Sequence, residues 1–159
     1  MSYELCGLGG TFDHLHDGHK LLLRTAFRLG KKVVIGLATD ELLVEKKYKN
    51  MIQTFEERKD GIINYIRSIN SEYPSKCGII PLNDPFGPAI TEPNLEIHVS
   101  SEESYKNALK INDIRQERGL RKMIIVIIPA VLNNEGKKIS STDIRKASIS
   151  LNKNKSNVV

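Results

Sequence analysis

The sequence predicts an α/β protein, in which helices cover both faces of a parallel sheet of about five strands. Short, solidly apolar segments alternate along the chain with longer segments whose apolar residues recur at helical spacing. Solid apolar runs are typical of strands that are buried on both faces of a parallel sheet. The length of 159 residues suits one domain, which we place at residues 1–151, with residues 152–159 as a flexible, lysine-containing tail.

Helix signals separate most of the expected strands. The strands are expected at residues 3–8, 33–38, 77–82, 95–99 and 123–128. After the first strand, Asp17 is expected to cap a helix, and Gly30 to follow the end of that helix in the left-handed conformation. After the second strand, residues 54–57 form a capping box, and isoleucines at helical spacing follow it.

The second half of the chain contains one long irregular connection and two further helix signals. Residues 81–94 hold four of the six prolines, and the loop 84–92 within them is long enough that we expect it to shape a substrate pocket. Residues 100–103 have the pattern of a capping box for a helix that Gly119 can close. Residues 140–143 have the same pattern and are expected to begin the last helix.

The composition indicates which kind of partner the protein binds and where it is located. A net charge of +5 and a pI of about 9.2 favour an anionic partner, either nucleic acid or a phosphorylated small molecule. Nucleic acid is disfavoured because the tyrosines and phenylalanines form no stripe among basic residues. No apolar run is long enough to cross a membrane and no signal peptide is recognisable, so a cytoplasmic location is expected. Cys6 and Cys77 are expected to be buried free thiols.

The most unusual residues of the chain all follow expected strands. The segment 9–19, GGTFDHLHDGH, follows the first strand, and the lysine-rich residues 46–49 follow the second. The proline-rich segment follows the third strand, and residues 139–145 follow the fifth. Ligands of open parallel sheets bind beyond the carboxyl ends of the strands, so these four segments are expected to surround one site.

The segment GGTFDHLHDGH has the composition of an anion site. Gly9 and Gly10 let the backbone approach a ligand closely, and the helix N-terminus beyond them presents amide donors and a partial positive charge. His16 and His19 are three residues apart, so both can face one ligand and donate hydrogen bonds to phosphate. Three of the four histidines in one such turn favour a site over an exposed surface turn.

Commoner phosphate and metal motifs are absent from the sequence. There is no GxxxxGK[ST] run, no GxGxxG after the first expected strand and no HExxH. A metal site built from the histidines is therefore not expected.

Two motifs at opposite ends of the chain carry a resemblance to a known superfamily. GTFDHLHDGH resembles the first signature of the HxGH nucleotidyltransferases, and ISSTDIR, residues 139–145, resembles their second signature. The sequence between them, from LNDPFGPAITEPN onward, resembles the phosphopantetheine adenylyltransferases of archaea and the corresponding domain of eukaryotic CoA synthase. The resemblance runs from residue 3 to about residue 147 and implies a Rossmann-like nucleotidyltransferase fold.

The resemblance implies transfer of the adenylyl group of ATP to 4′-phosphopantetheine, giving dephospho-CoA and pyrophosphate in coenzyme A synthesis. The attacking group is already an anionic phosphate, so no strong general base is needed. Catalysis would then rest on positioning and on electrostatic stabilisation of the α-phosphate. Mg²⁺ is expected to arrive with ATP, held mainly by phosphates and water rather than by protein ligands.

The resemblance also implies roles for individual residues. His19 would donate to the α-phosphate, Thr11 would bridge the two phosphates, and Lys46 would orient the incoming phosphate, with Lys47 as a rival for the role of Lys46. ATP is expected to contact Gly10, Thr11, Phe12, His16, His19, Asn112, Arg115, Ser140, Ser141, Thr142 and Arg145. Phosphopantetheine is expected to contact Thr11, Lys46, Arg58 and Asp84.

Simpler structural interpretations stay open for several of these residues. Arg58 could pair with a glutamate one turn away, and Asn112 and Arg115 could lie on an exposed helix face. Residues 140–143 could serve only as a helix cap. His98 lies within an apolar strand and is expected to be a core or edge residue.

Other functions are alternatives to this interpretation. Cytidylyltransferases share the first signature but usually have an RTEGISTT-like run where this chain has KKISSTDIR, and NMN adenylyltransferases commonly have arginine where Thr11 stands. An FAD synthetase is a third member of the same superfamily. A nucleotide-binding module without catalysis, or a basic nucleic-acid binder, is an alternative of another class. The sequence does not indicate the oligomeric state.

Overall fold

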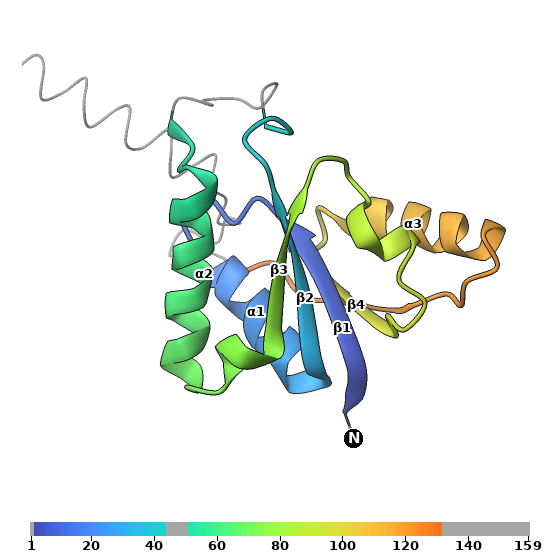
Figure 1. The fold of residues 1–159 in the computed structure, drawn as a ribbon, viewed down its shortest axis with the longest axis horizontal. Coiled ribbons are helices and arrows are strands. Elements are labelled where there is room, and N and C mark those ends of the chain that lie inside the picture. Colours follow the sequence, from blue (N-terminus) through green and yellow to red (C-terminus); the bar gives the residue numbers. More distant parts are fainter. Residues whose placement is uncertain (1, 44–50, 132–159) are drawn as a thin grey trace, which may run out of the picture.

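The chain folds around one parallel sheet. The structure is a computed structural model and describes residues 2–43 and 51–131. The described strands are β1 (Tyr3–Gly10), β2 (Gly30–Ala38), β3 (Cys77–Leu82), β4 (Ile97–Ser100) and β5 (Ile124–Ile127). They pair in the order β3-β2-β1-β4-β5, and all neighbours are parallel. The carboxyl ends therefore meet at one edge, the upper edge of the sheet in Figure 1. The predicted α/β class with a five-stranded parallel sheet is confirmed.

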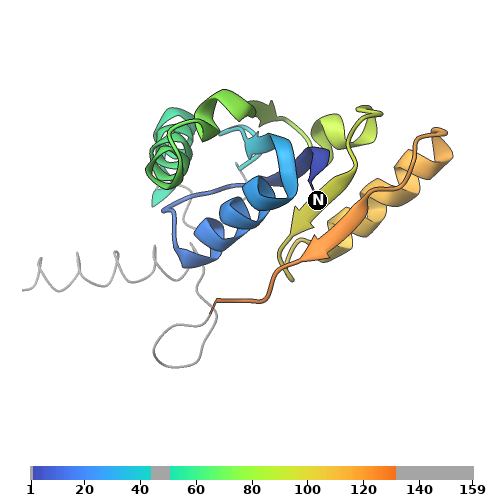
Figure 2. The same cartoon turned by 90° about the horizontal axis from the view of Figure 1, so that it is seen from below.

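Helices cover both faces of the sheet, as predicted. The helices are α1 (Asp17–Leu29), α2 (Phe55–Ile69) and α3 (Tyr105–Glu117), with short 3-10 turns at η2 (Tyr73–Lys76) and η3 (Gly87–Ile90). Figures 1 and 2 show α1 and α2 on one side of β1 and β2, and α3 on the other side. The main core lies under α1 and α2, and a smaller cluster of Ala89, Leu95, Ile111 and Met123 lies under α3.

The strand register determines which side chains face which layer. Cys6 of β1 pairs with Val33 of β2 and with Ile97 of β4, and all three are buried in the main core. The next residue of each strand, Gly7, Val34 and His98, pairs in the same way. Successive side chains of a strand point to opposite faces. This second row therefore faces α3 and η3.

Two helix boundaries differ from the prediction. Gly30 is extended, with φ at −110°, and begins β2 directly. A glycine is needed there for close approach, because a Cβ would lie 2.6 Å from Cβ of Cys6. The capping box expected at residues 100–103 is wrong: α3 begins at Tyr105, after Ser104. The Ser104 hydroxyl instead hydrogen-bonds with the hydroxyls of Ser100 and Ser101, which makes a turn before the helix.

Other local predictions are confirmed. The Thr54 hydroxyl accepts from the Glu57 amide, and the Glu57 carboxylate accepts from the Thr54 amide, as a capping box requires. Gly119 follows α3 with φ at +76°, the left-handed conformation expected of a glycine there.

Both cysteines are free thiols. Cys6 is buried and Cys77 is partly buried. Burial raises the pKa of Cys6 to about 12 and that of Cys77 to about 11, so both stay protonated and unreactive near neutral pH.

No helix in the described part of the chain combines the length and the apolar character needed to span a bilayer. The expected helix from residues 140–143, the domain limit at residue 151 and the tail at residues 152–159 lie outside the described residues.

Candidate active site

The turn between β1 and α1 is held in an unusual conformation. Phe12 and His14 both have positive φ, at 52° and 45°, which side chains other than glycine rarely adopt. The fully buried Asp13 accepts from the Gln53 amide at 2.8 Å. The His14 amide donates to Oε1 of Gln53 at 3.0 Å, and its ring lies 2.9 Å from the Met51 carbonyl. These bonds fix the turn against the segment that precedes α2.

Backbone bonds set the orientation of the two motif imidazoles. Nδ1 of His16 accepts from the Gly18 amide at 3.0 Å, and Nδ1 of His19 accepts from the His16 amide at 3.3 Å. His16 therefore caps α1, so the expectation that Asp17 caps this helix is wrong. The two rings stack with centroids 3.8 Å apart. With Nδ1 accepting, each neutral ring carries its proton on Nε2, which is the atom that can donate to an anion.

The N-terminus of α1 and the protonation state of His16 determine the electrostatics of the site. The N-terminus of α1 lies directly behind His16, and helix N-termini favour phosphate. Burial lowers the pKa of His16, while the charges of Asp17 and Glu103 oppose this effect. His16 is therefore uncharged near neutral pH and acts as a hydrogen-bond donor rather than as a fixed charge. The prediction that His16 and His19 come together at the helix mouth is confirmed.

Gly10, Thr11 and Phe12, which precede the two imidazoles, lie in different environments. Gly10 ends β1, and a Cβ there would meet the Phe12 ring at 3.3 Å. Phe12 is 1% exposed and its ring packs 5.4 Å from that of His19. Thr11 lines the cavity described below, and its carbonyl accepts a hydrogen bond from Arg58. Gly10 and Thr11 are thus at the carboxyl edge of the sheet, where a ligand was expected, whereas the Phe12 ring supports the His19 ring from inside.

Arg58 is a buried clamp beneath this turn. Its side chain is fully buried, and it donates to the carbonyls of Gln53, Thr11 and Ala38 and to the carboxylate of Asp40. The simple interpretation that Arg58 pairs with a nearby glutamate is wrong, because its ionic partner is Asp40 at 3.0 Å. The guanidinium holds Thr11 in place, and contact with phosphopantetheine stays a prediction.

Asn112 and Arg115 are also engaged inside the protein. Asn112 exchanges two hydrogen bonds with the backbone of Met123, at 2.8 and 2.9 Å. Arg115 is 0% exposed and donates to four backbone carbonyls, those of Ala89, Glu92, Leu95 and Arg121. The interpretation of an exposed helix face is therefore wrong for both. These bonds give Asn112 and Arg115 a structural role, and their contact with ATP stays a prediction.

Asp84 organises the proline-rich loop. Its carboxylate accepts from the amides of Phe86 and Gly87, both at 2.8 Å, and these bonds lower the pKa of Asp84. Asp84 itself is exposed. Its contact with phosphopantetheine remains a prediction, whereas its role in shaping the loop is visible.

A cavity of about 250 Å³ lies between the sheet and the layer of α3 and η3. Its floor includes Gly7, Gly9 and Gly36, which have no side chains, and its roof comes from η3, α3 and the preceding loop. It extends to Gly10 and Thr11, at the turn that carries the two imidazoles. The expectation that the proline-rich loop shapes a pocket is met, because Pro85, Phe86, Pro88 and Ala89 line it.

The cavity also includes a residue whose place there the sequence did not indicate. His98 was expected as a core or edge residue, and it lies on the inner strand β4, where it lines the cavity wall. Asp13 and Gln53, which fix the turn, were missed as well, because they are 40 residues apart and nothing in the sequence links them. Lys46, Lys47, Ser140, Ser141, Thr142 and Arg145 lie outside the described residues.

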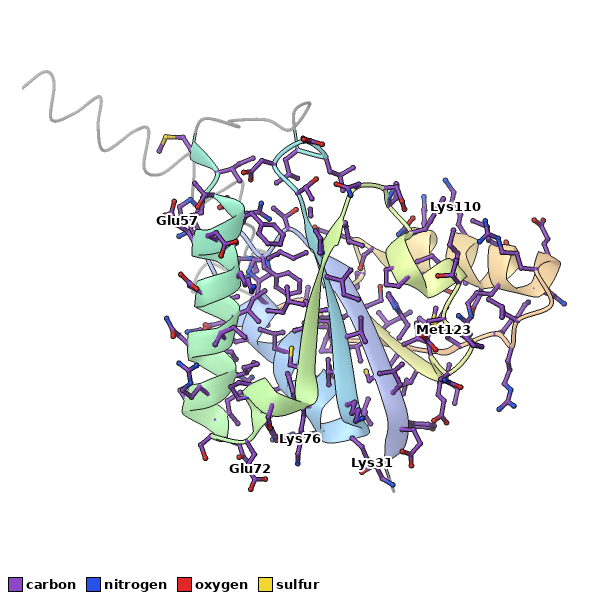
Figure 3. The ribbon with its side chains drawn as sticks, in the orientation of Figure 1. Lys31, Glu57, Glu72, Lys76, Lys110 and Met123 are labelled. Carbon is purple, nitrogen blue, oxygen red and sulfur yellow. The ribbon has the colours of Figure 1, made fainter. Side chains whose placement is uncertain are left out.

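The charged side chains at the far end of the sheet are separate from this site. Lys31 pairs with Glu4 and Lys76 pairs with Glu72, and all four side chains are exposed. Figure 3 shows Lys31, Glu72 and Lys76 at the end opposite to the carboxyl edge of β1. Exposed pairs of this kind contribute little to stability, so these residues are suitable as controls for substitutions at the site.

The fold, the glycine-ended first strand and the paired imidazoles define a class of nucleotide-binding enzymes. The model of the cytidylyltransferase-like family matches residues 8–147. A phosphopantetheine adenylyltransferase of Pyrococcus abyssi is 41% identical over 145 residues, which cover 91% of this chain and 90% of that protein. One from Thermococcus kodakarensis is 43% identical over 143 residues, covering 90% and 85%. The chain belongs to the cytidylyltransferase-like family, in the group that includes these phosphopantetheine adenylyltransferases.

Solved structures share the fold of this chain. A protein of unknown function from Archaeoglobus fulgidus superposes with a TM-score of 0.69 at 30% identity, over 88% of this chain and 100% of that one. A pantothenate synthetase from Thermus thermophilus superposes with a TM-score of 0.57 at 16% identity, over 89% of this chain and 61% of that one. This second likeness shows the fold alone.

Proposed function

We propose that the protein transfers the adenylyl group of ATP to 4′-phosphopantetheine, giving dephospho-CoA and pyrophosphate. The observation that carries the proposal is the stacked pair of His16 and His19 at the N-terminus of α1. This pair stands in a chain that is 41–44% identical to several phosphopantetheine adenylyltransferases. The activity belongs to the synthesis of coenzyme A.

The reaction needs charge stabilisation more than acid–base chemistry. A phosphate oxygen of the acceptor attacks the α-phosphorus of ATP, the bond between the α-phosphorus and the bridging oxygen breaks, and pyrophosphate leaves with the electron pair. His16 binds the triphosphate and His19 donates from Nε2 to the α-phosphate, where negative charge accumulates. Both donors are uncharged imidazoles held by backbone amides, so they need no reorganisation during the reaction.

The acceptor phosphate is placed beside Thr11, at the mouth of the cavity. Arg58 fixes the Thr11 carbonyl at 2.9 Å, which keeps this residue in register with the imidazoles. Lys46 is the cation proposed to orient the incoming phosphate. Lys46 follows Leu43, a residue that lines the cavity, by three positions in the sequence.

The remaining parts of the site rest on the family signature. Ser140, Ser141, Thr142 and Arg145 are proposed to bind the β- and γ-phosphates of ATP. Mg²⁺ is proposed to accompany ATP. Within residues 2–43 and 51–131, no three His, Cys, Asp or Glu side chains form a group that could hold a metal ion. A cytoplasmic location, without a nucleic-acid or membrane partner, is part of the same proposal.

A substrate matrix tests the proposed function. Pyrophosphate release is measured with Mg²⁺, with ATP or CTP as donor, and with 4′-phosphopantetheine, NMN, FMN or glycerol phosphate as acceptor. We expect turnover with ATP and phosphopantetheine alone. Turnover with another pair would keep the chemistry but contradict the assigned substrates. Folded protein that binds ATP without turnover in any combination would overturn the enzymatic function and favour a binding module.

A further inference from the structure

Among the described residues, one side chain in the wall of the cavity between the sheet and α3 has a buried polar atom without a hydrogen-bond partner. His98 lies next to Gly7 in the sheet register, on the face that looks toward the cavity. Leu95 packs over Gly7, because a Cβ at that position would lie 2.9 Å from Cδ1 of Leu95. The His98 ring is set among mostly apolar residues in the wall of the cavity.

The imidazole of His98 has one ring nitrogen without a hydrogen-bond partner among the residues that the structure describes. Its Nδ1 atom has almost no contact with solvent and no partner there. Leaving a polar atom in this state costs free energy, and such atoms in native proteins call for an explanation. Replacing the ring by an apolar side chain would remove that cost, so packing alone does not account for a histidine at this position.

The other polar side chains of the cavity roof have partners inside the protein. Nδ2 of Asn107 donates to the Pro85 carbonyl at 2.9 Å. The Ser104 hydroxyl bonds with those of Ser100 and Ser101, at 2.8 and 3.0 Å. These groups stabilise the loops around the cavity. Among the described residues that line the cavity, His98 has a ring nitrogen without a hydrogen-bond partner. This unused ring nitrogen suggests that a ligand enters the cavity and bonds with the imidazole.

The position of His98 matches the organic arm of the acceptor rather than its phosphate. The phosphate is placed at Thr11, just beyond Gly10. Gly7, the neighbour of His98, is four residues before Thr11, which corresponds to about 13 Å at the rise of a strand. We consider an acceptor whose phosphate lies at Thr11 and whose arm runs along the floor of the cavity. The amide groups of the arm are its polar groups at about this distance from the phosphate. They would therefore lie beside His98.

We propose that His98 is a specificity-determining residue, whose imidazole hydrogen-bonds an amide group of the pantetheine arm inside this cavity. The proposal rests on the proposed function and names the residue that recognises the arm of the acceptor. A neutral imidazole has one donor and one acceptor, and an amide offers both complements. Desolvation lowers the pKa of His98 to about 4, so the ring is uncharged in the pH range of an ordinary assay.

Two acceptors separate recognition of the arm from recognition of the phosphate. The wild type and His98→Leu are compared with 4′-phosphopantetheine and with neopentyl phosphate, which keeps a phosphate and a branched carbon but has no amide. For His98→Leu we expect kcat/KM to fall about tenfold with phosphopantetheine, from a larger KM, and to be unchanged with neopentyl phosphate. The KM for ATP should be unchanged. His98→Gln, which restores a donor and an acceptor, should recover part of the loss.

Stability and binding measurements keep the outcomes distinct. The Tm of His98→Leu should equal or exceed that of the wild type, because an unpartnered polar group has been removed. The control Ile97→Val, on the same strand but facing the main core, should lower Tm and leave the choice of acceptor unchanged. Equal losses with both acceptors, or no loss with phosphopantetheine, would overturn the role of His98. Should the wild type show no turnover, the proposed function fails, and calorimetric binding of phosphopantetheine to the two proteins still decides the role of His98.

Discussion

The two motif histidines show how single side chains are prepared for phosphate chemistry. In each ring Nδ1 is occupied by a backbone amide, so Nε2 is left to carry the proton. A ring fixed in this way donates a hydrogen bond without being charged, and its orientation does not depend on the ligand. The stacking of the rings at 3.8 Å then places two such donors side by side.

Removal of the His19 ring tests this arrangement. His19→Ala should reduce kcat by about 100- to 1,000-fold, because one donor to the α-phosphate is lost, while the KM for ATP changes much less. Pyrophosphate release at saturating substrates measures the effect. Lys31→Ala, at the opposite end of the sheet, is the control and should retain the wild-type kcat. A loss in His19→Ala of less than about fivefold would contradict a direct role in the transition state.

His98 should make the protein less stable in acid. Its pKa is lowered to about 4 in the folded protein, whereas the histidine of an unfolded chain has its ordinary pKa of 6.5. Between these values the unfolded state binds the proton and the folded state does not, so the free energy of unfolding falls as the pH decreases. By pH 4 the titration of His98 lowers the free energy of unfolding by at most about 3 kcal/mol.

Urea unfolding of the wild type and His98→Leu between pH 7.5 and 4 measures this effect. His16, whose pKa is also lowered, contributes with the same sign in both proteins. The difference in unfolding free energy between the two proteins should therefore grow in favour of His98→Leu as the pH falls below 6.5. Parallel curves would show that His98 titrates normally in the folded state.

At the scale of elements, close approach between β2 and β1 depends on one glycine. A Cβ at Gly30 would lie 2.6 Å from Cβ of Cys6 and 2.8 Å from the Lys32 carbonyl. Gly30→Ala should therefore destabilise the protein by about 1–3 kcal/mol. Gly61 lies inside α2 with nothing within 4 Å of its Cβ position, so Gly61→Ala should stabilise by about 0.5–1 kcal/mol. Urea unfolding measures both, and effects of equal sign would contradict the packing described.

Arg115 connects α3 to the chain that leads into β4. It donates to carbonyls of residues 89, 92 and 95, whereas Arg118, one turn later, is exposed and donates only to the Ile90 carbonyl among the described residues. Arg115→Ala should lower the free energy of unfolding by about 3 kcal/mol or more, because several buried carbonyls lose their donor. Arg118→Ala should cost less than about 1 kcal/mol. Equal effects of the two substitutions in thermal unfolding would contradict this structural role of Arg115. An increase in the KM for ATP in folded Arg115→Ala would support the predicted contact of Arg115 with ATP.

The elements themselves were largely predictable from the sequence, and their ends less so. Five solid apolar runs gave the five strands, and β3 was predicted at its observed limits. The start of α3 was wrong because serine hydroxyls can bond one another as well as a helix terminus. The cap of α1 was assigned to Asp17 because aspartate is a preferred cap residue, whereas the ring of His16 accepts the amide instead.

At the scale of the molecule, the two faces of the sheet have different roles. The face under α1 and α2 is packed with apolar side chains and supports the turn that carries the imidazoles. The face under α3 and η3 has glycines in the floor of the cavity and leaves space for a ligand. The sequence predicted the motif histidines and the loop around the cavity, because motif spacing and proline content are local features.

The residues whose surroundings the sequence did not predict share one physical property. Arg58, Asn112 and Arg115 have the chemistry of phosphate or base contacts, but each is buried and bonded to backbone groups far away in the chain. Residue type and spacing reveal what a side chain can bind, whereas its direction depends on packing between distant segments. The orphan atom of His98 belongs to the same class, because only the register of β4 against β1 brings it to the cavity.

The most direct measurement follows the label of α-³²P ATP in a reaction with 4′-phosphopantetheine and Mg²⁺. The proposed adenylyl transfer predicts that the label enters dephospho-CoA, and that one pyrophosphate is released for each labelled product molecule. Label from γ-³²P ATP should appear only in pyrophosphate. Transfer of the γ-label to the acceptor, or formation of labelled AMP regardless of the acceptor, would contradict the proposed reaction.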